Sequence, residues 1–211
     1  MDVDVVRGID IHIFFEIGLA LAVFGMGVFI GVKKKVKAFV AKTKEVDASY
    51  WNTHGKIHET LSELRVKTNA ARSQVLQFHN GEYFMDGVSM KLKSLTHESL
   101  ANGVAGEGDK KQRLQLSVFI PIMQVVMKNS PEIHEVKGKP ESYCKQVMET
   151  ANVVSFSVLP LKTKGSVTGY LMLQWCSLSK AIYTNEQQVR NEMEQARDRI
   201  EVYLSQDIIN N

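Results

Sequence analysis

The sequence has few cysteines, few prolines and little net charge. Its two cysteines, Cys144 and Cys176, are too few for a four-cysteine zinc site or a disulfide-rich scaffold, and four prolines exclude a proline-rich stalk. The 26 basic and 23 acidic residues nearly balance to +3, so no nucleic-acid partner is expected. Hydrophobic residues make up 44% of the chain, which is typical of a globular protein and excludes wholesale disorder.

Much of this apolar content lies near the N-terminus. The run from Ile17 to residue 32 is uncharged, and extending it back to residue 11 adds only His12 and Glu16 as polar interruptions. A helix over 11–32 would be roughly 33 Å long, about the thickness of the hydrocarbon layer. The pattern predicts a transmembrane helix over 11–32, with a buried soluble helix and a cleaved signal peptide as alternatives.

The charges that flank this run predict its orientation. The charged residues among positions 1–10 are mainly acidic, whereas Lys33, Lys34 and Lys35 follow the apolar stretch. A signal peptide has the opposite order, with its basic residues first. By the positive-inside bias, the tail 1–10 lies outside and the remaining chain is cytoplasmic. We therefore expect an uncleaved single-pass anchor in the lipid bilayer of the cell inner membrane.

Two patterns predict pairing with a second copy. Gly27 and Gly31 form a small-xxx-small pair that allows close approach of membrane helices. A helical connector is expected over 33–55, and apolar positions then continue at alternating steps of four and three. These positions, typical of a two-stranded coiled coil, are Ile57, Leu61, Leu64, Thr68 and Ala71. A homodimer is the prediction; packing of this face onto the chain's own domain is the alternative use.

Residues 56–211 form the predicted cytoplasmic domain. Strand patterns cover 73–81, 114–122, 152–162 and 167–176, and the last two read as a hairpin around a Gly-containing turn. A helix is expected to begin at Pro140. A capping box from Thr184 to Gln187 precedes an amphipathic helix of about 24 residues. The region 81–113 reads as irregular and polar. The order predicts an α+β fold with an antiparallel sheet flanked by helices.

The C-terminal third resembles a GAF domain. The residues that carry the resemblance are the hairpin SFSVLPLKTKGSVTGYLMLQW, with Gly165 in its turn and Gly169 opening its second strand, and the following YTNEQ. The resemblance covers about residues 56 to 208. The stretch with FHNG followed by a THE element also resembles small GAF-like proteins of phages and bacteria.

This resemblance implies that the first and last helices cover one face of the sheet and that a pocket lies on the other. GAF domains bind cyclic nucleotides, bilins, haem or small metabolites, or only dimerise. The NKFDE motif of cyclic-nucleotide binders is absent, and Cys144 is followed by Lys145 rather than by histidine. Both of those ligand classes are therefore disfavoured, and the cofactor stays unidentified.

Polar and aromatic residues gather around Gly81. The candidate ligand-binding residues are Phe78, His79, Asn80, Glu82, Phe84, Asp86, Met90, His97, Glu98 and Trp175. Turn formation is the competing role for Asn80, and a core position is the competing role for Trp175. The basic end of the loop 101–113 lacks the GxxxxGK[ST] phosphate-binding pattern, and that loop is expected to be solvated.

These patterns predict a membrane-anchored, non-enzymatic sensor or binding module that engages a small ligand or a protein partner. No catalytic or metal-binding residue is assigned. One alternative is a structural or interaction membrane protein with an empty pocket, encoded by a phage. A second is a small metal-dependent enzyme that uses His79 and His97, although their spacing matches no zinc motif.

Overall fold

The structure, a computed structural model, describes residues 33, 35, 50–85, 87–176 and 185–210. The predicted tail 1–10, the membrane helix 11–32 and most of the connector 33–55 lie outside the described residues. Within the described part, no helix is both long and apolar enough to cross a bilayer. The membrane anchor and its orientation therefore remain predictions.

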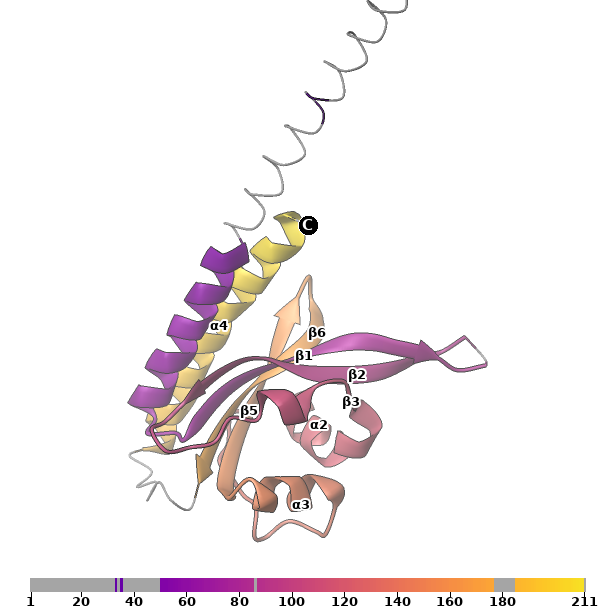
Figure 1. The fold of residues 1–211 in the computed structure, drawn as a ribbon. Helices are drawn as coiled ribbons and strands as arrows, with labels where there is room; N and C mark the ends of the chain where they lie inside the picture. The colour runs from indigo at the N-terminus through magenta and orange to yellow at the C-terminus, as the bar shows by residue number, and fades with distance from the viewer. Residues whose placement is uncertain (1–32, 34, 36–49, 86, 177–184, 211) are drawn as a thin grey trace, which may run out of the picture. The chain divides into compact units, whose positions relative to one another are not determined.

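A six-stranded sheet forms the centre of residues 50–211. Its strand order is β3-β2-β1-β6-β5-β4, and each neighbouring pair is antiparallel. The strands are β1 (Arg72–Tyr83), β2 (Ser89–Leu100), β3 (Leu114–Gln115), β4 (His134–Glu135), β5 (Val153–Thr163) and β6 (Ser166–Cys176). Together with the helices on either side of the sheet (Figure 1), this arrangement confirms the predicted α+β class.

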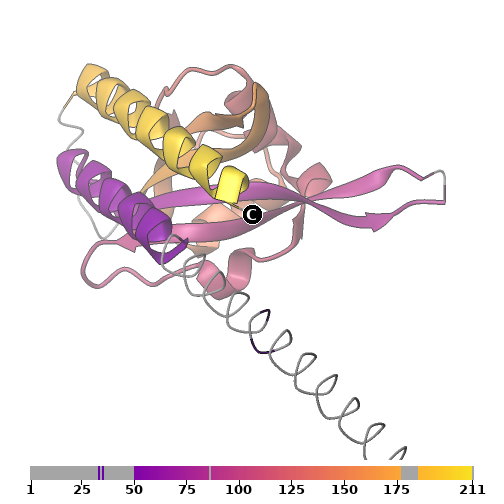
Figure 2. The same ribbon diagram turned by 90° about the horizontal axis from the view of Figure 1, so that it is seen from above.

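Two long helices lie side by side over one face of the sheet (Figures 1 and 2). They are the helix over residues 50–67 and α4 (Glu186–Asn210). Their facing apolar side chains join those of β5 and β6 in one core cluster. The five predicted coiled-coil positions between residues 57 and 71 are all buried in this domain. Packing onto the chain's own domain is thus the use that the structure shows, and these positions are not available to a second copy.

Shorter elements cover the opposite face. They are the 3-10 turns η1 (Gly108–Lys111) and η2 (Leu116–Phe119), followed by α2 (Ile120–Met127) and α3 (Tyr143–Thr150). Side chains of η2, α2 and α3 pack on Leu76 and Tyr170 in a second core cluster. The strand predicted over 114–122 is wrong, because only two residues pair with β2 and Pro121 stands in the first turn of α2. A short apolar run has no decisive period, and proline fits the first turn of a helix.

The β5–β6 hairpin is confirmed. Thr163 pairs with Ser166 across a turn in which Lys164 and Gly165 have φ values of 51° and 79°, the left-handed conformation of a two-residue hairpin turn. Ser155 and Ser157, the polar residues that alternate with apolar ones along β5, are fully buried. Both faces of this strand are covered, one by each helical layer.

The predicted turn at Asn80 and Gly81 is also wrong. β1 continues to Tyr83, where it pairs with Ser89, and the chain turns between residues 84 and 88. The region 81–113, predicted to be irregular, therefore contains β2. Its lysines and serines have low strand propensity, so the sequence pattern did not predict a strand there. Beyond Gln77, β1 no longer pairs with β6. From there β1 and β2 extend together as a two-stranded arm, the β1–β2 arm (Figures 1 and 2).

The helix starts differ from the predictions by a few residues. α3 begins at Tyr143 rather than Pro140, because the Ser142 hydroxyl accepts a hydrogen bond from the Lys145 backbone N–H at 3.2 Å. At α4 the Gln187 backbone N–H donates to Asn185 Oδ1 at 2.9 Å, which satisfies one free donor of the first turn. The proposed cap Thr184 lies outside the described residues.

Candidate functional site

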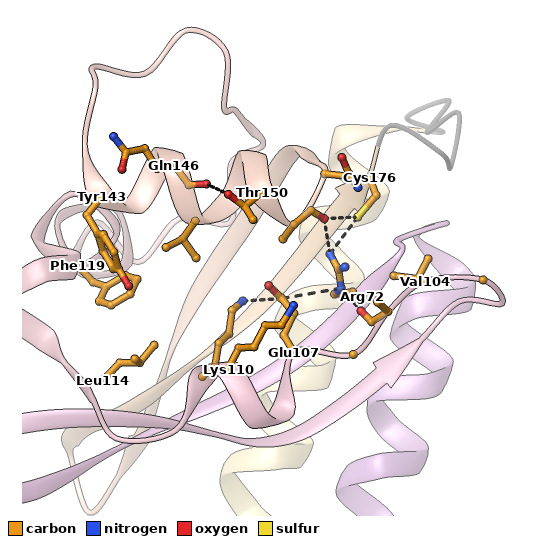
Figure 3. Close-up of a pocket in the computed structure, with 17 residues that line it drawn as sticks. Arg72, Val104, Glu107, Lys110, Leu114, Phe119, Tyr143, Gln146, Thr150 and Cys176 are labelled. Atoms are coloured by element: carbon orange, nitrogen blue, oxygen red, sulfur yellow. Dashed lines mark hydrogen bonds and ion pairs between the residues drawn. The ribbon is translucent and has the colours of Figure 1, made fainter.

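A cavity of about 500 Å³ lies on the face of the sheet opposite the two long helices. Its walls are α3 and the segment 103–111, and its floor is formed by the start of β1 and the end of β6 (Figure 3). This volume is within the range of small-molecule sites. The side chains that line it include Arg72, Val104, Glu107, Lys110, Lys111, Leu114, Phe119, Tyr143, Gln146, Thr150 and Cys176.

The floor of the cavity is polar because of the register between β1 and β6. Arg72 pairs with Gln174, and alternate residues along each strand share a face. The buried Arg72 guanidinium donates from Nε to the Ala105 carbonyl at 3.0 Å and from Nη1 to the Ala151 carbonyl at 3.2 Å. Nη1 also lies 3.2 Å from Gln174 Oε1. Arg72 therefore ties the sheet to both walls of the cavity.

A buried ion pair closes the wall at η1. Lys111 Nζ lies 2.6 Å from Glu107 Oε2, and Gln74 Nε2 donates to the same oxygen at 2.8 Å. Glu98 accepts hydrogen bonds from Gln74 Nε2 at 2.6 Å and from the Glu107 backbone N–H at 3.1 Å. The loop that was expected to be solvated is thus fixed to the sheet by Glu107 and Lys111.

The charges facing the cavity favour an anionic ligand. Burial alone would raise the pKa of Glu107, but Lys111, Gln74 and Arg72 hold it below its usual value. Glu107 is therefore a carboxylate at neutral pH, with Lys111 and Arg72 within ion-pair distance. The lining contains a third basic side chain, Lys110. Arg72 Nη2 makes no hydrogen bond to any described residue. Its two N–H groups remain available to an acceptor in the cavity.

A smaller cavity of about 10 Å³ lies beside the large one and is lined in part by Glu107, Lys111 and Phe119, which also line the large cavity. Lys93 lines it, with Nζ donating to Tyr170 Oη at 2.8 Å and lying 3.3 Å from the centre of the Phe119 ring. Burial, and then the charge of Lys111, lower the pKa of Lys93 to about 7. Burial raises the pKa of the Tyr170 hydroxyl, which therefore stays protonated.

The two cysteines are poor nucleophiles in these surroundings. Cys176 lines the cavity, with its Sγ 3.1 Å from Arg72 Nη1; burial raises its pKa by more than the Arg72 charge lowers it. The Cys144 thiol donates to the Val118 carbonyl at 3.3 Å, and burial raises its pKa as well. Both are free thiols, and a protonated thiol reacts slowly.

The structure distributes the residues of the predicted site over three places. Glu98 alone belongs to the hydrogen-bond network beside the cavity. Trp175 lies in the core under the long helices, where Nε1 donates to the Thr68 carbonyl at 3.1 Å, so the core role is the one observed. Phe78 packs on Tyr170 with ring centres 6.0 Å apart. None of the three lines the large cavity.

The remaining candidates, apart from His97 and Asp86, lie along the β1–β2 arm. His79 Nε2 is 2.9 Å from Ser94 Oγ, and Asn80 Oδ1 accepts from Lys91 Nζ at 2.8 Å. Glu82 and Phe84 are exposed, and Met90 is half-buried. Asp86 lies outside the described residues. The arm therefore explains their clustering in the sequence without a cavity around them.

His79 and His97 are far apart on the sheet. His97 pairs with Val75, four residues along β1 from His79, and its Nε2 lies 2.6 Å from His54 Nδ1 with the two rings stacked at 11°. Among the described residues, no three His, Cys, Asp or Glu side chains are placed to hold one metal ion. His79 and His97 therefore do not form a shared metal site.

Acid should weaken the contact between His97 and the helix over residues 50–67. Burial, followed by His54 and His58, lowers the pKa of His97 to about 4. Since this value is below that of the unfolded chain, about 6.5, neutral His97 contributes full stability above pH 6.5 and loses it as the pH falls towards 4. We expect the stability difference between wild type and His97→Gln to narrow over that interval in thermal unfolding; a constant difference would contradict the assignment.

Comparison with known proteins tests the fold. No protein-family model matches the chain, and no curated protein matches it in sequence. Solved structures do. The phycoerythrobilin-bound GAF domain of a cyanobacterial phytochrome superposes with a TM-score of 0.53 at 16% identity, covering 80% of this chain and 93% of that one. The chain has the GAF fold.

Two further solved structures, the first of them a GAF domain, have a similar fold. The blue-light absorbing form of the Thermosynechococcus elongatus PixJ GAF domain has a TM-score of 0.55 at 15% identity over 77% of this chain and 94% of that one. A far-red cyanobacteriochrome photoreceptor has a TM-score of 0.56 at 12% identity over 82% and 97%. The GAF arrangement predicted from the terminal hairpin and helix is thereby confirmed.

Proposed function

We propose that this chain is a non-enzymatic, ligand-binding sensor module whose ligand is a small anion. The observation that carries the proposal is the lining of the 500 Å³ cavity, which contains three basic side chains, Arg72, Lys110 and Lys111, and one carboxylate, Glu107. Because Arg72 and Lys111 are shielded from bulk water, they interact more strongly with an anion than they would in water. A carboxylate or phosphate group can accept both hydrogen bonds from Arg72 Nη2.

The structural neighbours support a small-molecule ligand. One is described as bound to phycoerythrobilin and another as bound to phycocyanobilin. We do not extend bilin binding to this chain, because Cys144 is buried and is followed by Lys145 rather than by a histidine. The neighbours support the binding of a small molecule in a GAF cavity. The class of that molecule is inferred from the charged side chains of this chain's own cavity.

We also propose that the helix over 11–32 anchors the module in the inner membrane, with the GAF domain cytoplasmic. The uncharged run from Ile17 and the lysines that follow it support this placement. A homodimer formed through Gly27 and Gly31 is part of the same proposal. Retention in the membrane pellet after alkaline carbonate washing tests the anchor, and release into the supernatant contradicts it.

The anion proposal predicts a specific role for Lys110. This side chain is exposed at the cavity mouth, so Lys110→Gln removes one charge without opening the core. We expect succinate and inorganic phosphate to raise the melting temperature of the full chain in detergent by mass action. Lys110→Gln should weaken the better of the two anions by about fivefold, the effect of roughly 1 kcal/mol.

Lys164→Gln is the matched control, because Lys164 is an exposed lysine in the β5–β6 turn. Its variant should bind the anion as the wild type does. Equal weakening in both variants would show a general charge effect, and no response to either anion in the wild type would contradict the proposal. The second result would favour the interaction protein with an empty cavity.

One observation favours that alternative function. Large apolar side chains are exposed around the tip of the β1–β2 arm, at Tyr83, Phe84, Met85 and Val88. A two-stranded ribbon that extends beyond its sheet is marginally stable in water, and an exposed apolar tip is typical of a surface that contacts a partner. An interaction protein would use this arm rather than the cavity.

A further inference from the structure

Lys93 is a buried lysine without an ion pair among the described residues. It is 2% exposed, and its Nζ is held between the Tyr170 hydroxyl and the face of Phe119. Structural lysines usually keep their ammonium in water or against a carboxylate. A lysine amine removed from water in this way is more often neutral, and a neutral amine can act as a nucleophile.

We propose that Lys93 captures the carbonyl group of a small oxo acid as a reversible imine, with the acid group held by Arg72 and Lys111. This inference rests on the proposed function, since it names the class of the anion: an aldehyde or ketone that also carries a carboxylate. Capture of this kind is binding without turnover.

The two cavities supply the two halves of such a ligand site. The large cavity presents the cations, and the small one contains the amine; Glu107, Lys111, Phe119 and Val147 line both. The small cavity has room for about one water molecule. A carbonyl oxygen next to Nζ would occupy that space while the carboxylate remains in the larger cavity. The ligand must therefore be short, with its carbonyl close to its acid group.

The protonation state of Lys93 suits this chemistry. With a pKa of about 7, about half of the amine is neutral at pH 7, whereas fewer than roughly one in a thousand ordinary lysines are neutral there. The Phe119 face favours the ammonium by a cation–π contact and opposes part of this effect. Burial raises the pKa of the Tyr170 hydroxyl, so it is protonated at neutral pH and acts as a relay that gives up one proton as it takes up another.

The capture step balances without an oxidant or reductant. The lone pair of neutral Nζ forms the C–N bond as the carbonyl π pair moves to oxygen, and one proton passes from nitrogen to that oxygen. The resulting carbinolamine loses its hydroxyl, which takes a proton from Tyr170 and leaves as water. In the same step the nitrogen lone pair forms the C=N bond and the remaining nitrogen proton passes to Tyr170, which ends protonated as it began. The net change is amine plus carbonyl to imine plus water.

Reductive trapping tests the proposal. The full chain in detergent is incubated with glyoxylate and sodium cyanoborohydride, which converts an imine into a stable carboxymethyl group on the lysine. Peptide mass spectrometry then measures the rate at each lysine. We expect Lys93 to be labelled at least about tenfold faster than Lys164, because about half of the Lys93 amine is neutral at pH 7. Oxalate, an anion without a reactive carbonyl, should slow labelling of Lys93 and leave Lys164 unchanged.

Two variants separate the roles. Lys110→Gln, at the rim of the cavity, should slow the labelling of Lys93, and the variant protein should fold as the wild type does. Tyr170→Phe keeps the ring and removes the proton donor, so labelling of Lys93 should fall at least about tenfold, with calorimetric binding of oxalate preserved.

The outcomes distinguish this inference from the function on which it rests. Calorimetric binding of oxalate without preferential labelling of Lys93 would overturn the imine and leave the anion site standing. Equal labelling of Lys93 by acetaldehyde, which has no acid group, would overturn the assignment of an oxo acid. Absence of both oxalate binding and labelling would overturn both proposals.

Discussion

Replacing Gly169 by alanine is expected to destabilise the protein by about 3 kcal/mol, a fall of roughly 6 to 12 °C in melting temperature for a domain of this size. Gly169 pairs with Gln77 where the central strands β1 and β6 are in contact. A Cβ at this position would lie 2.3 Å from the Leu76 carbonyl oxygen and 3.1 Å from Gln77 Cα. Both are backbone atoms, so relief requires the two central strands to separate.

Gly55→Ala is the matched control, because nothing lies within 4 Å of a Cβ added at Gly55. This residue is exposed within the helix over residues 50–67, where alanine should add up to about 1 kcal/mol of stability. The same substitution thus has opposite signs at the two sites in thermal unfolding of the full chain. A Gly169→Ala protein that melts with the wild type would contradict the β1–β6 register.

Gly169 also shows why the GAF fold was predictable from the sequence. The terminal hairpin combines apolar strands, a Lys-Gly turn and a capped helix, and each of these has a local pattern. β2 has no such pattern. Its residues 91–94 read Lys-Leu-Lys-Ser, and the lysine at 93 is buried only because η2 and Tyr170 cover it. A strand defined by tertiary contacts of this kind is not visible in local propensities.

The candidate site was predicted less well for a related reason. Most residues of the predicted site are neighbours in the chain, and those between His79 and Met90 that the structure describes lie along the β1–β2 arm. The residues that meet at the cavity come from β1, the segment 103–111, α3 and β6, which are distant in sequence. One local pattern was present: Arg72 and Gln74 stand two apart in an apolar strand and so share a face.

Arg72 is also the residue whose replacement has the second large expected effect on the free energy of unfolding. We expect Arg72→Met to cost about 3 kcal/mol, the low end of the range for breaking a buried ion pair. Methionine preserves much of the volume but removes the donors to the Ala105 and Ala151 carbonyls and to Gln174. It also leaves Glu107, 3.9 Å from Arg72 Nε, with Lys111 as its sole cation within ion-pair distance among the described residues.

Arg199→Met tests whether burial is the cause. Arg199 also pairs with a carboxylate, Glu63, at 2.9 Å, but both side chains are more than one-third exposed, and exposed pairs contribute about 0 to 1 kcal/mol. The two variants therefore make the same chemical change in different surroundings, and chemical denaturation at pH 7 should separate them by about 2 kcal/mol or more. If Arg72→Met costs no more than Arg199→Met, the guanidinium does not hold the cavity walls together, and the anion site loses the rigid floor on which its selectivity depends.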